Sequence, residues 1–240
     1  MRFVPIKTED QLDVQALHRV RERLVSRRTS VINQIRAFLL ERGISFAKGP
    51  ASLRRLMPEI LENADDQLTA RMRRLLDFLW QEWKHLQLQI ESLGEDLEKI
   101  ASSDEACIRL QKIPGVGPLV ATAVVSAIGN GAAFKKVREF SAWLGLVPGQ
   151  WSTGGKTKLL GISKRGNPYL RKMFIHGARA VVLRAKREGS YLGQWMKSLE
   201  GRATRNVVTV ATANRLARIS WAVLSSGENY HPMPALAVAS

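Results

Sequence analysis

Two adjacent hydroxyls, those of Ser152 and Thr153, lie in a glycine-rich segment that contains many cations and no acids. The stretch from Pro148 to Lys172 reads PGQWSTGGKTKLLGISKRGNPYLRK. A hydroxyl can attack phosphorus, and lysines and arginines neutralise the charge that builds up in the transition state. Glycines let the backbone approach a bulky polyanion. The pattern therefore predicts chemistry on a phosphodiester.

Serine and threonine beside glycine most often serve as turn formers, so the context of this loop has to favour function. The loop lies between Gly149 and the pair Gly154 and Gly155, and no Ser-His-Asp arrangement offers another nucleophile. The loop and the helix expected after it supply residues that we predict to contact nucleic acid: Gly154, Gly155, Lys156, Lys158, Lys164, Arg165, Arg171, Lys172 and Arg179.

The charge of the chain indicates a polyanionic partner. The chain has 240 residues and a formal net charge of +16, and 45% of its residues are hydrophobic, as is ordinary for a folded protein. Between Gln150 and Arg218 there are fifteen lysines and arginines but only two acids, Glu188 and Glu200. Such a field attracts polyanions and steers association with them, so nucleic acid is the expected partner.

Other sequence features indicate in which compartment the protein acts and whether it binds a metal. No apolar run approaches the roughly 18 residues of a spanning helix, and the N-terminus carries no apolar signal segment, so we expect no membrane partner and a cytoplasmic, nucleoid-associated protein. Cys107 is the single cysteine, which excludes an internal disulfide. The four histidines lack any ligand spacing, so no structural zinc is predicted.

The elements that must position these residues are mostly helical. Apolar residues recur at spacings of three, four and seven from Thr8 to Arg42, with arginines on the other face, and again from Pro58 to Ala101. The first pattern predicts one long basic amphipathic helix, and the second predicts a helical arm or coiled coil after a short helix at 52–57. The helix that packs against this arm comes either from this chain or from another copy of it. Trp80 and Trp83 are expected to anchor a core or an interface.

From Asp104 on, shorter helices joined by Gly and Pro are predicted. Their expected ranges are 104–112, 118–128, 139–144, 168–188 and 207–225, with a small hairpin within 151–160. The predicted fold class is mainly α: a long, coiled-coil-like helical arm followed by a compact helical domain that contains a helix-hairpin-helix motif.

That motif is expected at residues 108–128, where IPGVGP joins two apolar helical patterns. Gly115 and Gly117 allow a tight turn, and free N–H groups at the start of the following helix can bind a phosphate without reading base sequence. The alternative is a plain Gly-Pro turn between packed helices.

Two motifs carry a resemblance to a known family: LxxIPGVGPxxAxxxxxxIG, and the later FSAWLGLVPGQWSTGGKTKLLGISKRGNPYLRKMFIHGARAV. They closely resemble the C-terminal domain of the bacterial insertion-sequence transposases of the IS116/IS110/IS902 family. Residues 206–227 and the first 44 residues also look like these proteins, so the resemblance covers essentially the whole chain. It implies DNA recombination by a serine nucleophile, often guided by a structured RNA. It also implies oligomerisation through the arm and a separate acidic domain that holds Mg²⁺.

The chain departs from the family pattern in two places. In members with a YESG-like loop the nucleophilic serine falls on the position of Thr153, whereas this chain has Ser152 one residue earlier. Position favours Thr153, and the less hindered primary hydroxyl favours Ser152. The family's acidic quartet lies before the sequence that corresponds to MRFVPIK, where this chain begins. We therefore expect a truncated chain with no metal site or cofactor, and Mg²⁺ only with the missing domain.

The resemblance and the patterns together divide the chain into four parts. These are residues 1–46, a long basic helix that leads from the missing domain; 47–105, the helical arm; 106–228, the transposase domain with the Ser/Thr-Gly loop at 148–167; and 229–240, a flexible tail. The expected function is that of a DNA transposase or recombinase subunit that forms homo-oligomers and is not self-sufficient without the acidic domain. The alternative is a non-catalytic remnant or regulator that binds DNA or RNA.

Overall fold

The computed structural model describes residues 6–62, 68–184 and 190–232, with the side chain of Thr157 excepted. The chain separates into two compact units, which are described in turn. Ala16–Asp96 form the α1–α3 unit, and Met1–Gln15 together with Leu97–Ser240 form the C-terminal unit. Within the described residues, no helix is both long and apolar enough to span a bilayer.

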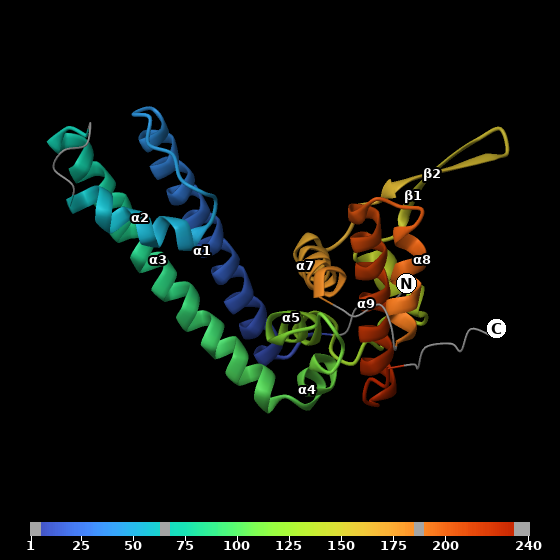
Figure 1. Cartoon of the computed structure of the whole chain (residues 1–240). Helices are drawn as coiled ribbons and strands as arrows, with labels where there is room; N and C mark the ends of the chain where they lie inside the picture. The colour runs from blue at the N-terminus through green and yellow to red at the C-terminus, as the bar shows by residue number, and fades with distance from the viewer. Residues whose placement is uncertain (1–5, 63–67, 185–189, 233–240) are drawn as a thin grey trace. The chain divides into compact units, whose positions relative to one another are not determined.

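Three helices share one core in the α1–α3 unit (Figure 1). They are α1 (Glu9–Leu40), α2 (Pro50–Glu62) and α3 (Ala70–Ser103). The buried core takes Ile35 from α1, Leu53 from α2 and Leu76 from α3, and Arg28 of α1 donates to Gln87 of α3 at 2.7 Å. The partner of the predicted arm helix therefore comes from the same chain. Trp80 and Trp83 stack at 4.9 Å and are buried, so the prediction that they anchor a core is confirmed.

The expected start of the second long helix was wrong. Pro58 lies inside α2, and α3 begins only at Ala70. Leu53, Met57 and Ile60 continue a buried face across the proline at spacings of four and three. Burying that face outweighs the one helical hydrogen bond that proline removes, because each fully buried apolar side chain contributes about 1.5–3 kcal/mol.

His18 makes the stability of the α1–α3 unit sensitive to acid. Its side chain is buried, and burial together with the charge of Arg21 lowers its pKa from 6.5 to about 4. The unfolded chain therefore binds a proton that the native chain does not, so stability falls as the pH drops through this window. Between about pH 7 and pH 5 we expect a loss of roughly 2 kcal/mol. Urea unfolding should show it, and His18→Gln should flatten the pH dependence; an equally steep dependence in the variant would contradict this origin.

Six helices and one hairpin are described in the C-terminal unit. The helices are α4 (Glu105–Gln111), α5 (Pro118–Ile128), α6 (Val137–Trp143), α7 (Pro168–Arg184), α8 (Tyr191–Glu200) and α9 (Arg205–Ser226), and the hairpin consists of β1 (Pro148–Thr153) and β2 (Lys156–Ile162). Local signals define several ends: Asp104 caps α4 through Cys107 N–H at 2.7 Å, and Gly227 ends α9 in the left-handed conformation.

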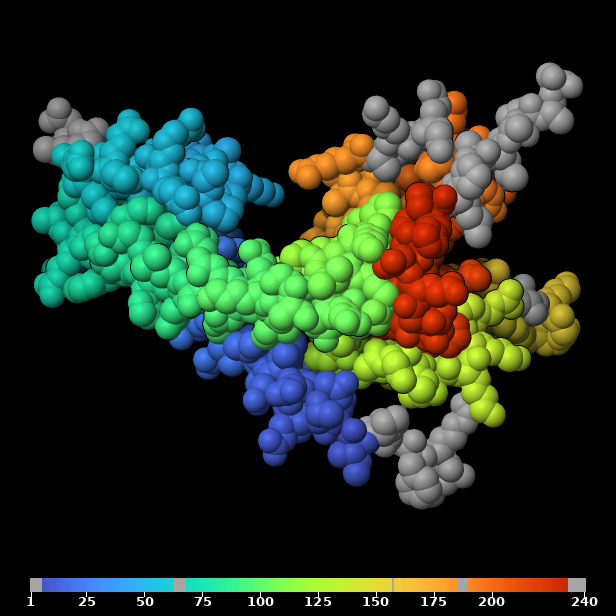
Figure 2. Space-filling model, turned by 90° about the horizontal axis from the view of Figure 1, so that it is seen from below, coloured from blue at the N-terminus to red at the C-terminus, as the bar shows by residue number. Residues whose placement is uncertain are grey.

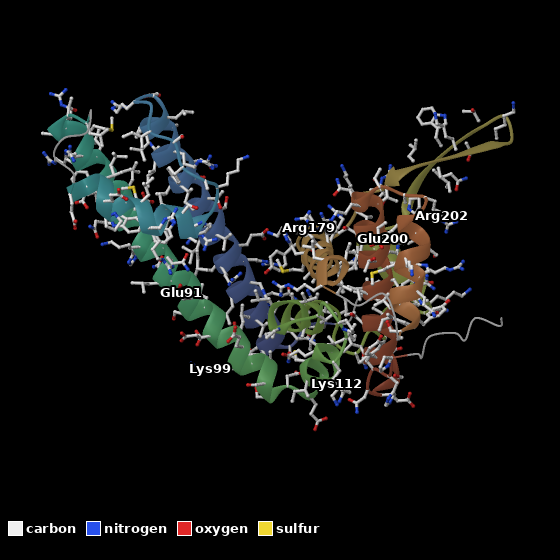
Figure 3. The ribbon with its side chains drawn as sticks, in the orientation of Figure 1. Glu91, Lys99, Lys112, Arg179, Glu200 and Arg202 are labelled. Atoms are coloured by element: carbon white, nitrogen blue, oxygen red, sulfur yellow. The ribbon has the colours of Figure 1, made fainter. Side chains whose placement is uncertain are left out.

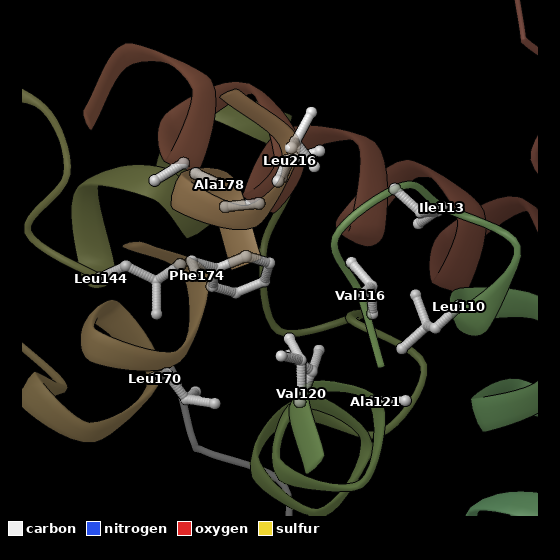
Figure 4. Packing of buried hydrophobic residues seen from close by; sticks show 14 of the residues in the cluster. Leu110, Ile113, Val116, Val120, Ala121, Leu144, Leu170, Phe174, Ala178 and Leu216 are labelled. Carbon is white, nitrogen blue, oxygen red and sulfur yellow. The ribbon is translucent and has the colours of Figure 1, made fainter. Parts of the chain in front are cut away.

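α9 is the central helix of this unit and contacts α4, α6, α7 and α8. In the space-filling view of Figure 2 its red atoms lie directly against the green atoms of the α4 region. Phe174 of α7 fills the middle of the core, surrounded by Leu144, Leu170, Ala178 and Leu216 (Figure 4). The ring is almost fully buried and meets Phe140 edge to face at 6.2 Å. This packing holds α6 and α7, and with them the two ends of the hairpin segment.

The predicted class, mainly α with a long helical arm, is confirmed, and so is the small hairpin. α5 has the bounds expected from the sequence, while α8 was not predicted. The expected helix at 168–188 is described to Arg184, and the next five residues lie outside the described part. α4 and α5 flank the IPGVGP turn, whereas its identity as a phosphate-binding helix-hairpin-helix stays a prediction.

Candidate functional site

A tight β-turn presents the two candidate hydroxyls at the tip of the hairpin. Gly154 and Gly155 both have positive φ, +55° and +77°. Such a two-residue loop with positive φ at both positions matches the twist of paired strands. Nothing lies within 4 Å of a side chain added at either glycine, so conformation and not space requires glycine here. The turn leaves Ser152 and Thr153 exposed on the last residues of β1.

The strand register separates the two hydroxyls. Thr153 pairs with Lys156, and Ser152 pairs with Thr157. Directly paired residues share a face of a hairpin, and successive residues alternate between faces. Thr153 therefore lies on the face that carries Lys156, and Ser152 lies on the other. We call the first the lysine face, defined by Trp151, Thr153, Lys156, Lys158 and Leu160.

The surroundings of the two hydroxyls differ accordingly. The five residues of the lysine face line a shallow pocket of about 420 Å³. On the opposite face, the Ser152 hydroxyl accepts a hydrogen bond of 2.7 Å from the Gln150 amide. Thr153 thus stands beside two cations, whereas Ser152 is engaged by a neutral side chain. Of the predicted residues, the structure brings Thr153, Lys156 and Lys158 together.

A second group lies in the loop after β2, at the base of the hairpin. Lys164 has a positive φ of 56°, and its N–H donates to Gly145 at 3.2 Å. Arg171 donates from Nη1 to the carbonyl of Leu144 at 2.9 Å. A side chain at Gly166 would overlap the carbonyl oxygen of Trp143. Arg171 also donates to the carbonyl of Arg165 at 3.4 Å and so links the loop to the end of α6, while the side chains of Lys164 and Arg165 remain exposed.

A third group forms a basic ridge on α7. Lys172, His176 and Arg179 are spaced by four and three residues, which places them on one face of the helix. Burial and the charges of Arg179 and Lys172 lower the pKa of His176, as expected of neighbouring cations. Lys172 also lies 5.2 Å from the centroid of the Tyr169 ring, and Arg179 projects from α7 in Figure 3.

The IPGVGP turn makes close contact with α7. Gly115 has a φ of +82°, and a side chain there would meet the carbonyl oxygen of Gly177 and the side chain of Val181. Gly117 caps the start of α5, with Pro118 in the first turn. The two glycines that were predicted to bind DNA thus have a packing role at Gly115 and a capping role at Gly117. Phosphate binding by this turn stays a prediction.

A cavity that is not predicted from the sequence is formed by the hairpin base, α8 and α9. Its notable feature is Arg215, whose guanidinium lies 4.7 Å from the centroids of both Tyr191 and Trp195. A signal for α8, one of the walls of this cavity, is present in the sequence. Ser190 caps α8 by accepting from Gly193 N–H at 3.1 Å, and apolar residues follow at helical spacing: Leu192, Trp195, Met196 and Leu199.

Acidic residues do not gather near these groups. Across the described ranges, no three His, Cys, Asp or Glu side chains lie close enough to hold a metal ion. The described residues therefore do not fit a magnesium centre, for which convergent carboxylates are the usual ligands.

Residues 107–192 match the family model described as "Transposase IS116/IS110/IS902 family". The chain is 44% identical over 230 residues to the transposase for insertion sequence element IS1111A of Coxiella burnetii, covering 96% of this chain and 63% of the relative. It is 42% identical to a probable family 20 transposase of Pseudomonas aeruginosa, covering 97% and 69%, and 42% identical to the transposase for IS1328 of Yersinia enterocolitica, covering 95% and 67%. The chain thus spans 63–69% of the length of these relatives.

Proposed function

Because the chain belongs to the IS116/IS110/IS902 family of transposases, we propose that it acts in DNA transposition by binding DNA and supplying a hydroxyl nucleophile. The observation that carries the proposal is the position of Thr153 on the lysine face of an exposed hairpin. Its β-turn leaves the hydroxyl open to a polymer as large as DNA. A covalent protein–DNA adduct that survives denaturation tests the proposal.

The proposed step is a transesterification. Thr153 Oγ1 attacks phosphorus, the bond from phosphorus to one sugar oxygen breaks, and the DNA strand becomes joined to the protein by a new phosphodiester. The hydroxyl proton leaves to solvent, and the departing sugar oxygen takes a proton from solvent, so no oxidant or reductant is consumed. Lys156 and Lys158 stabilise the negative charge of the transition state. Attack by a second sugar hydroxyl on the same phosphorus releases the protein.

No step in this proposal uses a metal ion held by this chain, because the described residues provide no set of carboxylates for one. Mg²⁺, the acidic domain, a guide RNA of the element and further copies of the chain are proposed partners in the complete reaction. A protein that recombines bacterial DNA would act in the cytoplasm, at the nucleoid.

A second candidate function is DNA or RNA binding without catalysis. The cation groups on the hairpin, the loop and α7 favour it, since each can contact phosphates without any reaction. The lack of convergent carboxylates among the described residues also fits this alternative. Adduct formation separates the two functions, because a binding protein forms none.

DNA binding by the candidate site is expected to depend on salt. Replacing both Lys156 and Lys158 by Gln should weaken binding and reduce the slope of log K against log salt by about two, close to one unit per lost phosphate contact. The pair Lys164→Gln and Arg165→Gln should have a similar effect. Fluorescence anisotropy over a salt series measures both slopes. Lys48→Gln removes one exposed charge from the α1–α3 unit and is the control for loss of a charge away from the site, and an unchanged slope in either pair would refute its phosphate role.

A further inference from the structure

A large cavity lies within the C-terminal unit, between the base of the hairpin, α8 and α9. Its volume of about 1080 Å³ lies at the upper end of the roughly 300–1,000 Å³ typical of small-molecule sites. The walls are mostly apolar, and two of the side chains that line it, Leu160 and Val207, are 50% and 55% exposed. Apolar surface of this kind usually marks a place where a ligand or partner binds.

The polar groups of the cavity suit a nucleotide. Arg215 lies 4.7 Å from the ring centroids of Tyr191 and Trp195, which places a cation and two aromatic rings in the wall, and the exposed Arg218 adds a second cation. Asn214 donates from Nδ2 to the carbonyl of Leu146 at 3.0 Å, so its amide oxygen can accept from a base edge. Proteins bind unpaired bases by stacking them on aromatic rings or arginine planes and by hydrogen-bonding their edges.

The cavity borders the lysine face at Leu160. Leu160 lines both the cavity and the shallow pocket beside Thr153. Leu160 lies four residues along β2 from Lys156, the partner of Thr153, which corresponds to about 13 Å of extended strand. A single strand of nucleic acid spans that distance in a few nucleotides. One strand can therefore contact the lysine face with a phosphate and enter the cavity with a nearby base.

We propose that this cavity receives an unpaired nucleobase of the DNA strand whose phosphate lies on the lysine face. The inference rests on the proposed function and adds a substrate class to it: DNA with a base displaced from its partner close to the reacting phosphate. Charge favours this occupant over an apolar protein segment. Arg215 and Arg218 both line the cavity, and the stretch from Gln150 to Arg218, which supplies most of its lining, carries fifteen cations against two acids.

The test compares two DNA duplexes that differ only at one unpaired position, which holds either an adenine or an abasic residue. Every protein in this test carries Ser152→Ala and Thr153→Val, so that no covalent chemistry contributes. The protein with only these two changes is called the parent. The parent protein is expected to bind the adenine duplex about tenfold more tightly, within the range measured for stacking one base on an aromatic ring. Ala211→Phe fills the cavity from α9 and should reduce this preference to about twofold or less, with affinity for the abasic duplex retained.

Two further variants keep the test decisive. Ala180→Phe places the same side chain on an exposed position of α7 and should keep the full preference, and Trp195→Ala should remove the preference without filling the cavity. Equal affinity of the parent for both duplexes would overturn the inference and leave the proposed function standing, whereas no binding to either duplex would overturn both. If Ala211→Phe altered self-association in light scattering but not the preference for adenine, the cavity would belong to a protein segment and the inference would fail.

Discussion

Thr153→Val is expected to lower formation of the covalent protein–DNA adduct by about a thousandfold or more, as removal of a nucleophile does in other enzymes. Valine keeps the branched shape of threonine, so the hairpin should be unchanged while the hydroxyl is lost. Ser152→Ala is expected to change adduct formation by only a few-fold. Its hydroxyl lies on the opposite face of the hairpin and accepts from Gln150.

The measurement uses end DNA of the element together with the proposed guide RNA, and resolves the products under denaturing conditions. Thr153→Ser is the positive control, since it restores a less hindered hydroxyl at the same position and should keep the adduct. An adduct that survives Thr153→Val but not Ser152→Ala would identify Ser152, on the opposite face, as the nucleophile. If the intact chain formed no adduct where a full-length relative forms one, only the binding function would remain.

The second large effect concerns stability. Gly177→Ala is expected to destabilise the C-terminal unit by roughly 3 kcal/mol, the upper part of the usual range for overpacking. A methyl group there would overlap the carbonyl oxygen of Gly115, which belongs to backbone and cannot rotate away. The clash would push the IPGVGP turn from α7 and disturb the buried Val116 and Val181 beside it.

Gly94→Ala is the matched control, because it is also a glycine-to-alanine change inside a helix. Gly94 lies in α3, with nothing within 4 Å of the added methyl group. It should stabilise the chain by about 0.5–1 kcal/mol, the difference in helix propensity between the two residues. Urea unfolding of both variants is therefore expected to show shifts of opposite sign. A neutral or stabilising Gly177→Ala would contradict the close approach of the turn and α7.

Much of the fold follows from local sequence signals. Pro118 and Gly129 bracket an apolar run, and α5 has the bounds that they predict. A small hairpin is expected within 151–160, and the structure has one there, formed by β1 and β2. The misses have physical causes. The sequence predicts a helix start at Pro58, whereas Pro58 lies inside α2, because the burial that keeps α2 intact depends on α1 and α3. α8 is not predicted, because its ten residues carry only a short apolar pattern after the Ser190 cap.

The sequence alone determined the chemical groups of this protein: two hydroxyls beside a glycine turn, an excess of cations, and the motifs of a transposase family. These properties are read along the chain, because charge, turn preference and helical period depend on residue type and short spacing. Only the tertiary structure decided how the groups are used. Strand register put Thr153 with the lysines and Ser152 on the other face, and packing committed Arg171 to the carbonyl of Leu144. The cavity at Arg215 exists because the hairpin base, α8 and α9 meet, and contacts between segments distant in sequence leave no periodic trace in any one of them.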